Sequence, residues 1–136
     1  MSKTFIDTNV VLYPLDHRDP RKQQIAREVL SRFAADGEGV ISTQVMVEAY
    51  AAGTRRLGIS EHAMQLVVEA LHSHEIIHTT PTLVEESIEI SKASQVSIWD
   101  ALILSAAIRA ECDILMTEDL NNGQEESCRA HSKRRV

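Results

Sequence analysis

The chain has 136 residues, of which 43% are hydrophobic and 25% are charged, which suits one domain with a hydrophobic core and argues against disorder. A formal net charge of −6 speaks against a general nucleic-acid binder, although Lys and Arg gather locally at 18–22, 55–56 and 129–135. No apolar run approaches the roughly 20 residues of a membrane span, and no signal-peptide pattern opens the chain, so we expect no membrane contact.

Short β-rich runs alternate with helical patterns in the first half of the chain. The expected elements, in chain order, are a strand at 3–7, a turn-bearing segment at 8–19, a helix at 20–36, a strand at 39–42 and a helix at 44–56. Asp19 is the expected N-cap of the first of these helices, ahead of Pro20, and Gly37 is its expected stop. Thr43 is the expected cap of the second.

The same alternation continues in the second half. The expected elements are a helix at 60–71, a strand at 75–79, a helix beginning at 80–81, an apolar helix at 99–110 and a strand at 113–117. In the helix after residue 80, Leu83, Ile88 and Ile90 are expected to face inward. The alternation predicts a single three-layer α/β/α domain with a central parallel sheet of four to five strands. We expect this domain to cover residues 1–124 and an irregular charged tail to cover 125–136.

Four carboxylates stand near the ends of these elements. Asp7 ends the first strand, Asp119 follows the last strand, Asp100 begins the apolar helix and Glu48 lies inside the second helix. Ligands of open α/β sheets bind at the carboxyl ends of the strands, so these acids could converge on one edge. Converging carboxylates repel unless a cation or protons neutralise them. Oxygen ligands without His or Cys suit Mg²⁺ or Mn²⁺, which can promote phosphodiester cleavage.

Each acid also has an ordinary structural explanation. Asp7 could form a turn or a helix cap, and Asp100 could stabilise a helix N-terminus by about 0.3–1 kcal/mol. Glu48 could lie on a solvated stripe with Gln44 and Arg55, which share its helical face. The fourth acid, Asp119, could be one more loop residue.

Four segments of the sequence resemble the ordered motifs of PIN-domain ribonucleases, above all the VapC-like toxins of type II toxin–antitoxin pairs. The segments are FIDTNVVLY, TQVMVEAY, WDALILSAA and ILMTEDLNNGQ, and they run from Phe5 to about Gln124. The resemblance implies a PIN-like fold and a Mg²⁺- or Mn²⁺-dependent endoribonuclease that cleaves RNA. It also implies a cognate antitoxin as protein partner.

The family pattern assigns roles to particular residues of this chain. The implied metal ligands are Asp7 and Asp100 as the principal pair, Glu48 as the third acid and Asp119 as the fourth. Thr117 would lend a hydroxyl, and Asn9 would orient Asp7 or a metal-bound water. The chain departs from the family after Gln124, where relatives usually continue into one more apolar strand; this predicts an unpaired sheet edge.

The partners can be anticipated in part. RNA would contact the basic groups at 18–22 and 55–56, and an antitoxin could place an Arg or Lys among the acids. Met46, Tyr50 and Met64 could offer apolar docking surface for the antitoxin or for a twofold homodimer, although Met46 is more typical of a core residue. Only two cysteines, Cys112 and Cys128, occur, without a CxxC pair, which indicates a reducing cytoplasm and no zinc site.

Two other functions fit parts of the pattern. One is a catalytically inactive PIN-like protein that is kept for interaction, which the unusual C-terminal residues favour. The other is a haloacid-dehalogenase-type phosphatase, which also opens with a strand and an aspartate. That class needs a second acid two residues after the first, and this chain has Asn9 there.

Overall fold

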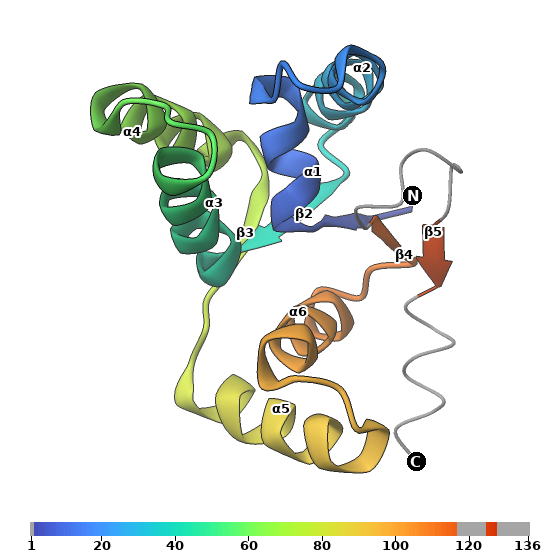
Figure 1. The fold of residues 1–136 in the computed structure, drawn as a ribbon. Helices are drawn as coiled ribbons and strands as arrows, with labels where there is room; N and C mark the ends of the chain where they lie inside the picture. The colour runs from blue at the N-terminus through green and yellow to red at the C-terminus, as the bar shows by residue number, and fades with distance from the viewer. Residues whose placement is uncertain (1, 117–124, 128–136) are drawn as a thin grey trace.

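The structure is a computed structural model that describes residues 2–116 and, as backbone, residues 125–127. Its strands are β1 (Thr4–Ile6), β2 (Gly39–Ser42), β3 (Glu75–Ile77), β4 (Ile114–Met116) and β5 (Glu125–Ser127). They form one sheet in the order β3-β2-β1-β4-β5, in which the first four strands are parallel and β5 is antiparallel to β4 (Figure 1). The predicted parallel sheet is therefore confirmed, with four parallel strands and β1 inside the sheet.

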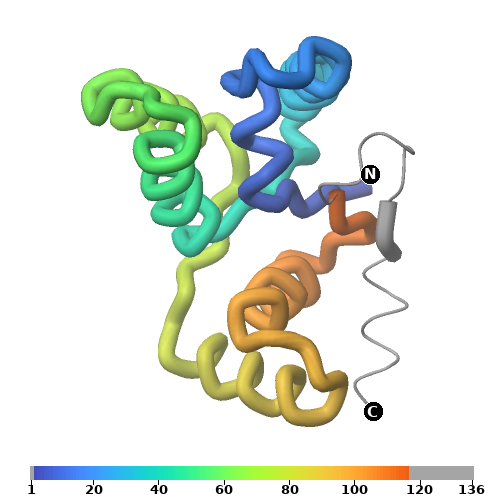
Figure 2. Tube along the Cα trace, viewed as in Figure 1, coloured from blue at the N-terminus to red at the C-terminus, as the bar shows by residue number. Residues whose placement is uncertain are grey.

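Helices cover both faces of the sheet. They are α1 (Thr8–Leu12), α2 (Pro20–Asp36), α3 (Thr43–Arg55), α4 (Glu61–Ala70), α5 (Pro81–Ser94) and α6 (Ile98–Arg109), with short 3₁₀ turns at Tyr13–Leu15 and Leu71–Ser73. Figures 1 and 2 show α1 to α4 on one side and α5 and α6 on the other, with the chain crossing between them through β3. This is the predicted three-layer α/β/α arrangement. No helix in the described part of the chain is long and apolar enough to cross a membrane.

The helix ends agree with the sequence signals in most places. Asp19 caps α2 by accepting a hydrogen bond from the Lys22 amide at 3.1 Å, and Gly37 ends this helix in the left-handed region at φ 70°. The expected cap of α3 is wrong by one residue: Ser42, not Thr43, accepts from the Val45 amide. Ser42 is wholly buried at the end of β2, so its hydroxyl is the one that lies against the first turn of α3.

The segment at 8–19 is more ordered than a turn-bearing connection. Residues 8–12 form α1, and three of them, Val10, Val11 and Leu12, are buried in the core. β-Branched residues have modest helix propensity, so the helix is stabilised by burial and not by its own sequence. This short helix begins directly after β1, which fixes the direction of the side chains at residues 7–9.

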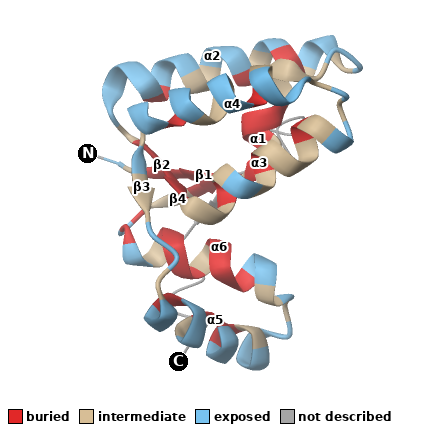
Figure 3. Ribbon diagram, turned by 90° about the vertical axis from the view of Figure 1, so that its left-hand side faces the viewer, coloured by how far each residue is buried: buried red, intermediate tan, exposed pale blue. Residues whose placement is uncertain are grey.

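The core lies on both faces of the buried strands (Figure 3). Phe5, Ile6 and Ile41 are fully buried. On the other side α5 and α6 pack together, and inside this layer the hydroxyls of Ser87 and Ser105 form a hydrogen bond of 2.9 Å, while Ser87 donates to the Leu83 carbonyl at 2.7 Å. Such a satisfied buried pair avoids the cost of an unpaired polar group.

The prediction that Ile88 of α5 faces inward is wrong. Leu83 and Ile90 are buried, seven residues apart on one helical face, whereas Ile88 is 44% exposed. Ser87 occupies the inward position between them, one turn after Leu83, so Ile88 is rotated toward solvent.

The C-terminal edge of the sheet also differs from expectation. Residues 125–127, which fall in the predicted irregular tail, form the short strand β5 and pair with β4, so the predicted unpaired edge of the sheet lies at β5. Ladder hydrogen bonds use backbone groups, so a polar EES segment can supply an edge strand without an apolar pattern. Thr117 and Asp119 lie outside the described residues. The division of the chain at residue 124 stays a prediction.

Close packing at the start of β2 involves a titratable group. A Cβ on Gly39 would lie 2.6 Å from Nδ1 of His74, so only glycine fits beneath the imidazole. Among the described residues, this buried Nδ1 has no hydrogen-bond partner, and burial lowers the pKa of His74 below its ordinary value of 6.5. Protonation of His74 is therefore less favourable in the folded chain than in the unfolded chain.

This predicts a loss of stability in mild acid. Below about pH 6.5 the unfolded chain binds a proton that the folded chain resists, so the contribution of His74 is complete above that pH and decreases below it. Melting temperatures measured between pH 7.5 and 5.5 should fall less for His74→Gln than for the parent protein. The exposed His72 is the matched control, and an identical effect of His72→Gln would contradict the assignment.

Candidate functional site

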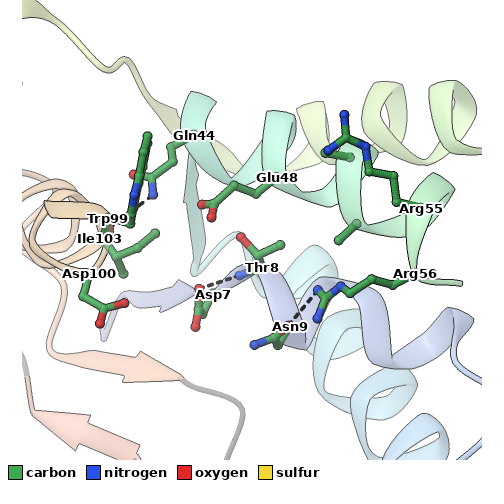
Figure 4. Close-up of a pocket in the computed structure, with 12 residues that line it drawn as sticks. Asp7, Thr8, Asn9, Gln44, Glu48, Arg55, Arg56, Trp99, Asp100 and Ile103 are labelled. Carbon is green, nitrogen blue, oxygen red and sulfur yellow. Dashed lines mark hydrogen bonds between the residues drawn. The ribbon is translucent and has the colours of Figure 1, made fainter. Parts of the chain in front are cut away.

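A pocket of about 460 Å³ lies at the carboxyl end of β1, where α1, α3 and α6 meet (Figure 4). Its lining residues are Asp7, Thr8, Asn9, Gln44, Glu48, Ala51, Ala52, Arg55, Arg56, Trp99, Asp100 and Ile103. This is the edge of an open α/β sheet where ligands bind. Three of the four acids expected at the site, Asp7, Glu48 and Asp100, line this one pocket, and each comes from a different element.

Asp7 is held by both its backbone and its side chain. Its amide donates to the carbonyl of Met116 at 3.1 Å, which joins the end of β1 to the end of β4. Its Oδ1 accepts from the Thr8 amide at 2.7 Å and caps α1. The capping role proposed from the sequence is thus real, but a carboxylate has about four acceptor sites, so capping does not prevent cation binding.

Asp100 lies in the first turn of α6 and is exposed. Its amide donates to Oγ of Ser97, the N-cap, at 3.1 Å. The buried part of α6 begins at the next residue, Ala101. The acid therefore borders an apolar run without being desolvated by it, and the buried helix behind it provides a rigid base.

Glu48 lies half-buried on α3. It shares a helical face with Gln44 and Arg55, as the sequence suggested, but this face borders the pocket and is not simply a solvated stripe. Nε2 of Gln44 donates to the backbone carbonyl of Trp99 at 3.2 Å. This hydrogen bond links α3 to α6, the two helices that carry Glu48 and Asp100.

The donor atoms suit a hard cation. The pocket offers three carboxylates and no His or Cys, and it also contains the Thr8 hydroxyl, which is buried without a hydrogen-bond partner among the described residues. An unpaired buried hydroxyl costs about 1–3 kcal/mol, so a bound ligand or water would relieve it. Within the described residues no three acidic, His or Cys side chains are close enough to hold an ion. Binding would therefore need side-chain rotation or residues beyond that part, among them Asp119.

The opposite end of the pocket is basic. Arg55 and Arg56 are exposed there, at the C-terminal end of α3. One guanidinium nitrogen of Arg56 donates to Oδ1 of Asn9 at 3.4 Å. Figure 4 shows the two arginines at one end of the pocket and Trp99 with Asp100 at the other, with Asp7 and Glu48 between them. The predicted role of Asn9 in orienting Asp7 or a water stays a prediction.

The other predicted basic group is partly neutralised. Arg18 binds the carboxylate of Asp16 through Nε at 2.8 Å and Nη2 at 2.9 Å. This pairing lowers the pKa of Asp16 to about 2. A smaller cavity of about 160 Å³ joins Arg18 to Arg56, but the charge of Arg18 is largely compensated by its partner.

Sequence reasoning missed Thr8 and Trp99 as pocket residues. Both are direct neighbours of a predicted ligand, Thr8 after Asp7 and Trp99 before Asp100, and that adjacency was the available signal. What the sequence could not give was the direction of either side chain, because it depends on where α1 and α6 begin.

Known proteins provide an independent comparison. The chain matches the PIN domain family over residues 4–122, and no curated protein sequence matches it. A toxin–antitoxin complex from Klebsiella pneumoniae has a similar structure, with 21% identity, a TM-score of 0.65 and 85% of each chain covered. The VapC20 toxin of Mycobacterium tuberculosis also has a similar structure, with 19% identity and a TM-score of 0.66. This match covers 88% of this chain and 94% of the toxin. VapBC2 from Rickettsia felis, bound to promoter DNA, is also similar, with 19% identity and a TM-score of 0.62, and the match covers 87% of this chain and 89% of the other.

The geometry predicts how charge removal affects the metal-free protein. In EDTA, Asp100→Asn should be at least as stable as the parent in urea denaturation, because it removes one of the three negative charges that line the pocket and keeps the side-chain shape. Asp7→Ala should lose about 0.5–2 kcal/mol through loss of the cap of α1, and Asp7→Asn much less. A loss of several kcal/mol for Asp100→Asn would instead make Asp100 a structural residue.

Proposed function

The chain belongs to the PIN-domain family, and from this we propose that it is a divalent-metal-dependent endoribonuclease, the toxin component of a toxin–antitoxin pair. The observation that carries the proposal is the meeting of Asp7, Glu48 and Asp100, from three elements, in one pocket at the carboxyl end of β1. Similar folds in toxin–antitoxin complexes, and in a toxin described as cleaving the sarcin-ricin loop, support it.

Asp7, Glu48 and Asp100, together with Asp119, would hold a Mg²⁺ or Mn²⁺ ion. Such an ion can activate water and stabilise the negative charge that develops during phosphodiester cleavage. The protein's own part is to hold the acids at fixed positions: Asp7 through the β1–β4 link and Asp100 through the buried α6. Thr117 would lend a hydroxyl, and Asn9 would orient Asp7 or a water.

The substrate we propose is RNA with unpaired segments, because RNA sequence is read mostly where bases are not paired. Arg55 and Arg56 are the phosphate contacts, since both line the same pocket as the acids. Arg18 contributes less than the sequence suggested because Asp16 compensates it. The overall charge of −6 is compatible with this, because the basic residues are placed locally.

We also propose a small antitoxin that blocks the pocket by inserting an Arg or Lys among the acids, since a guanidinium can bind a carboxylate in a bidentate manner. A separate apolar groove of about 560 Å³ lies between α3 and α4 and is lined by Met46, Val47, Tyr50 and Val68. This groove would bind hydrophobic side chains of the antitoxin or a second copy of the chain in a twofold dimer. Met64 does not belong to this surface, because it is fully buried against Gly53. We place the protein in the cytoplasm, with its RNA substrate.

The first test is cleavage itself. Purified protein with Mn²⁺ and a mixed RNA pool should produce new RNA ends that map to unpaired segments, and Asp7→Asn should reduce the rate by at least two orders of magnitude. Asp113→Asn, outside the pocket, is the matched control. Absence of cleavage by a folded, metal-bound protein would favour the alternative of a catalytically inactive interaction protein.

The second test concerns the basic end of the pocket. Arg55→Gln and Arg56→Gln should weaken RNA binding at low salt, and each lost phosphate contact should reduce the slope of log K against log salt by about 0.7. Arg109→Gln is the matched control, because Arg109 pairs with Glu86 at 2.7 Å on the α5–α6 side. Salt-independent binding by the parent protein would argue against a phosphate backbone as ligand.

A further inference from the structure

We propose that Trp99 is a stacking platform for an unpaired RNA base next to the bond that is cut. The proposal rests on the proposed ribonuclease function and adds a position for the base to it. It makes Trp99 a substrate-positioning residue and not a ligand of the metal.

Trp99 is exposed in a chain that otherwise covers its aromatic side chains. It is the single tryptophan of the sequence and is 63% exposed. Phe5 and Phe33 are buried, and Tyr13 and Tyr50 are half-buried against the core. A large apolar ring left in water forgoes a burial energy of about 1.5–3 kcal/mol, so its exposure beside a polar pocket indicates a ligand with a flat apolar face.

Different kinds of side chain follow one another along the length of the pocket. Trp99 lies at one end beside Gln44 and Asp100, Asp7 and Glu48 lie in the middle, and the arginines lie at the other end (Figure 4). Gln44 and Arg55 are eleven positions apart on one face of α3, which corresponds to about 16 Å along the helix. A nucleotide chain that crosses the pocket would meet a stacking surface, then the acids with their cation, then two guanidinium groups. Single-stranded nucleic-acid sites combine these same elements.

Trp99 is attached to the rigid part of the pocket. Its backbone carbonyl accepts from Nε2 of Gln44, and the Ser97 cap fixes the turn on which it lies. It directly precedes Asp100, so a base stacked on the indole would have a fixed position relative to that acid. Because a tryptophan has only two side-chain torsions, ordering it on binding costs little entropy.

The surroundings of Trp99 favour RNA over a protein partner. A protein anchor packs into apolar surroundings, and the separate groove between α3 and α4 offers such surroundings. The pocket of Trp99 instead contains acids and arginines. Every base has a π-face, so stacking alone predicts weak preference among bases.

Fluorescence of the single tryptophan tests the stacking directly. Single-stranded RNA mixed with the protein in Mg²⁺ should quench the indole fluorescence before products form. Inorganic polyphosphate of similar length carries the same charges without bases, and it should leave the fluorescence nearly unchanged. Equal quenching by polyphosphate would overturn the proposal, because the change would then report charge and not stacking.

Variants separate this proposal from the ribonuclease proposal. Trp99→Leu should weaken RNA binding roughly 5- to 150-fold, with an unchanged salt slope, and Trp99→Phe should recover most of the affinity. Leu66→Ala, which removes an exposed side chain on α4, is the matched control. Melting temperatures verify that each variant is folded.

Failure of the ribonuclease proposal and failure of the stacking proposal would give different results. A parent protein that neither binds nor cuts RNA contradicts the ribonuclease, and the stacking with it. A parent protein that cuts RNA, with Trp99→Leu showing the same KM and the same kcat, overturns the stacking alone and leaves Trp99 as a protein contact. An equal loss of RNA affinity in Trp99→Leu and Trp99→Phe would also overturn the stacking proposal, because an aromatic ring would then not be the required feature.

Discussion

The convergence of Asp7, Glu48 and Asp100 on one pocket is the constraint on which the proposed function depends. Asp7 lies at the junction of β1 and α1, Glu48 lies on α3 and Asp100 lies on α6, and each of these elements is anchored by contacts outside the pocket. β1 is buried inside the sheet, α6 is buried from Ala101 onward, and the Gln44–Trp99 hydrogen bond holds the two helices together. Like charges kept in one pocket without a cation lower stability, so such an arrangement is expected where a cation is part of the function.

The distribution of charge shows how an acidic chain could bind the proposed RNA substrate, which is itself an acidic polymer. Arginines occupy one end of the pocket, and the acids occupy the rest of it, where a divalent ion would neutralise them (Figure 4). Elsewhere in the described residues Lys3, Arg18, Lys92 and Arg109 each pair with a nearby carboxylate. Net charge therefore describes the solubility of this protein better than its ligand.

The sequence predicted the features that depend on local chemistry and on strand order. The alternation of strands and helices led to the parallel sheet, Asp19 and Gly37 gave the ends of α2, and strand-end acids were expected to converge. Features that depend on tertiary contacts were missed. Burial makes α1 a helix, Ser87 turns Ile88 outward, and pairing with β4 makes residues 125–127 a strand. Trp99 was missed for the same reason, since its exposure follows from the start of α6 and the contact with α3.

Metal binding by the folded protein is the most direct test of the central claim. A ligand that binds only the folded state raises its stability by RT ln(1 + [L]/Kd), about 2.7 kcal/mol at a hundredfold excess over Kd. Thermal unfolding with and without Mn²⁺ should show a rise in melting temperature for the parent protein and none for the Asp7→Asn, Asp100→Asn double variant. An equal rise in both proteins would contradict a cation site formed by these acids.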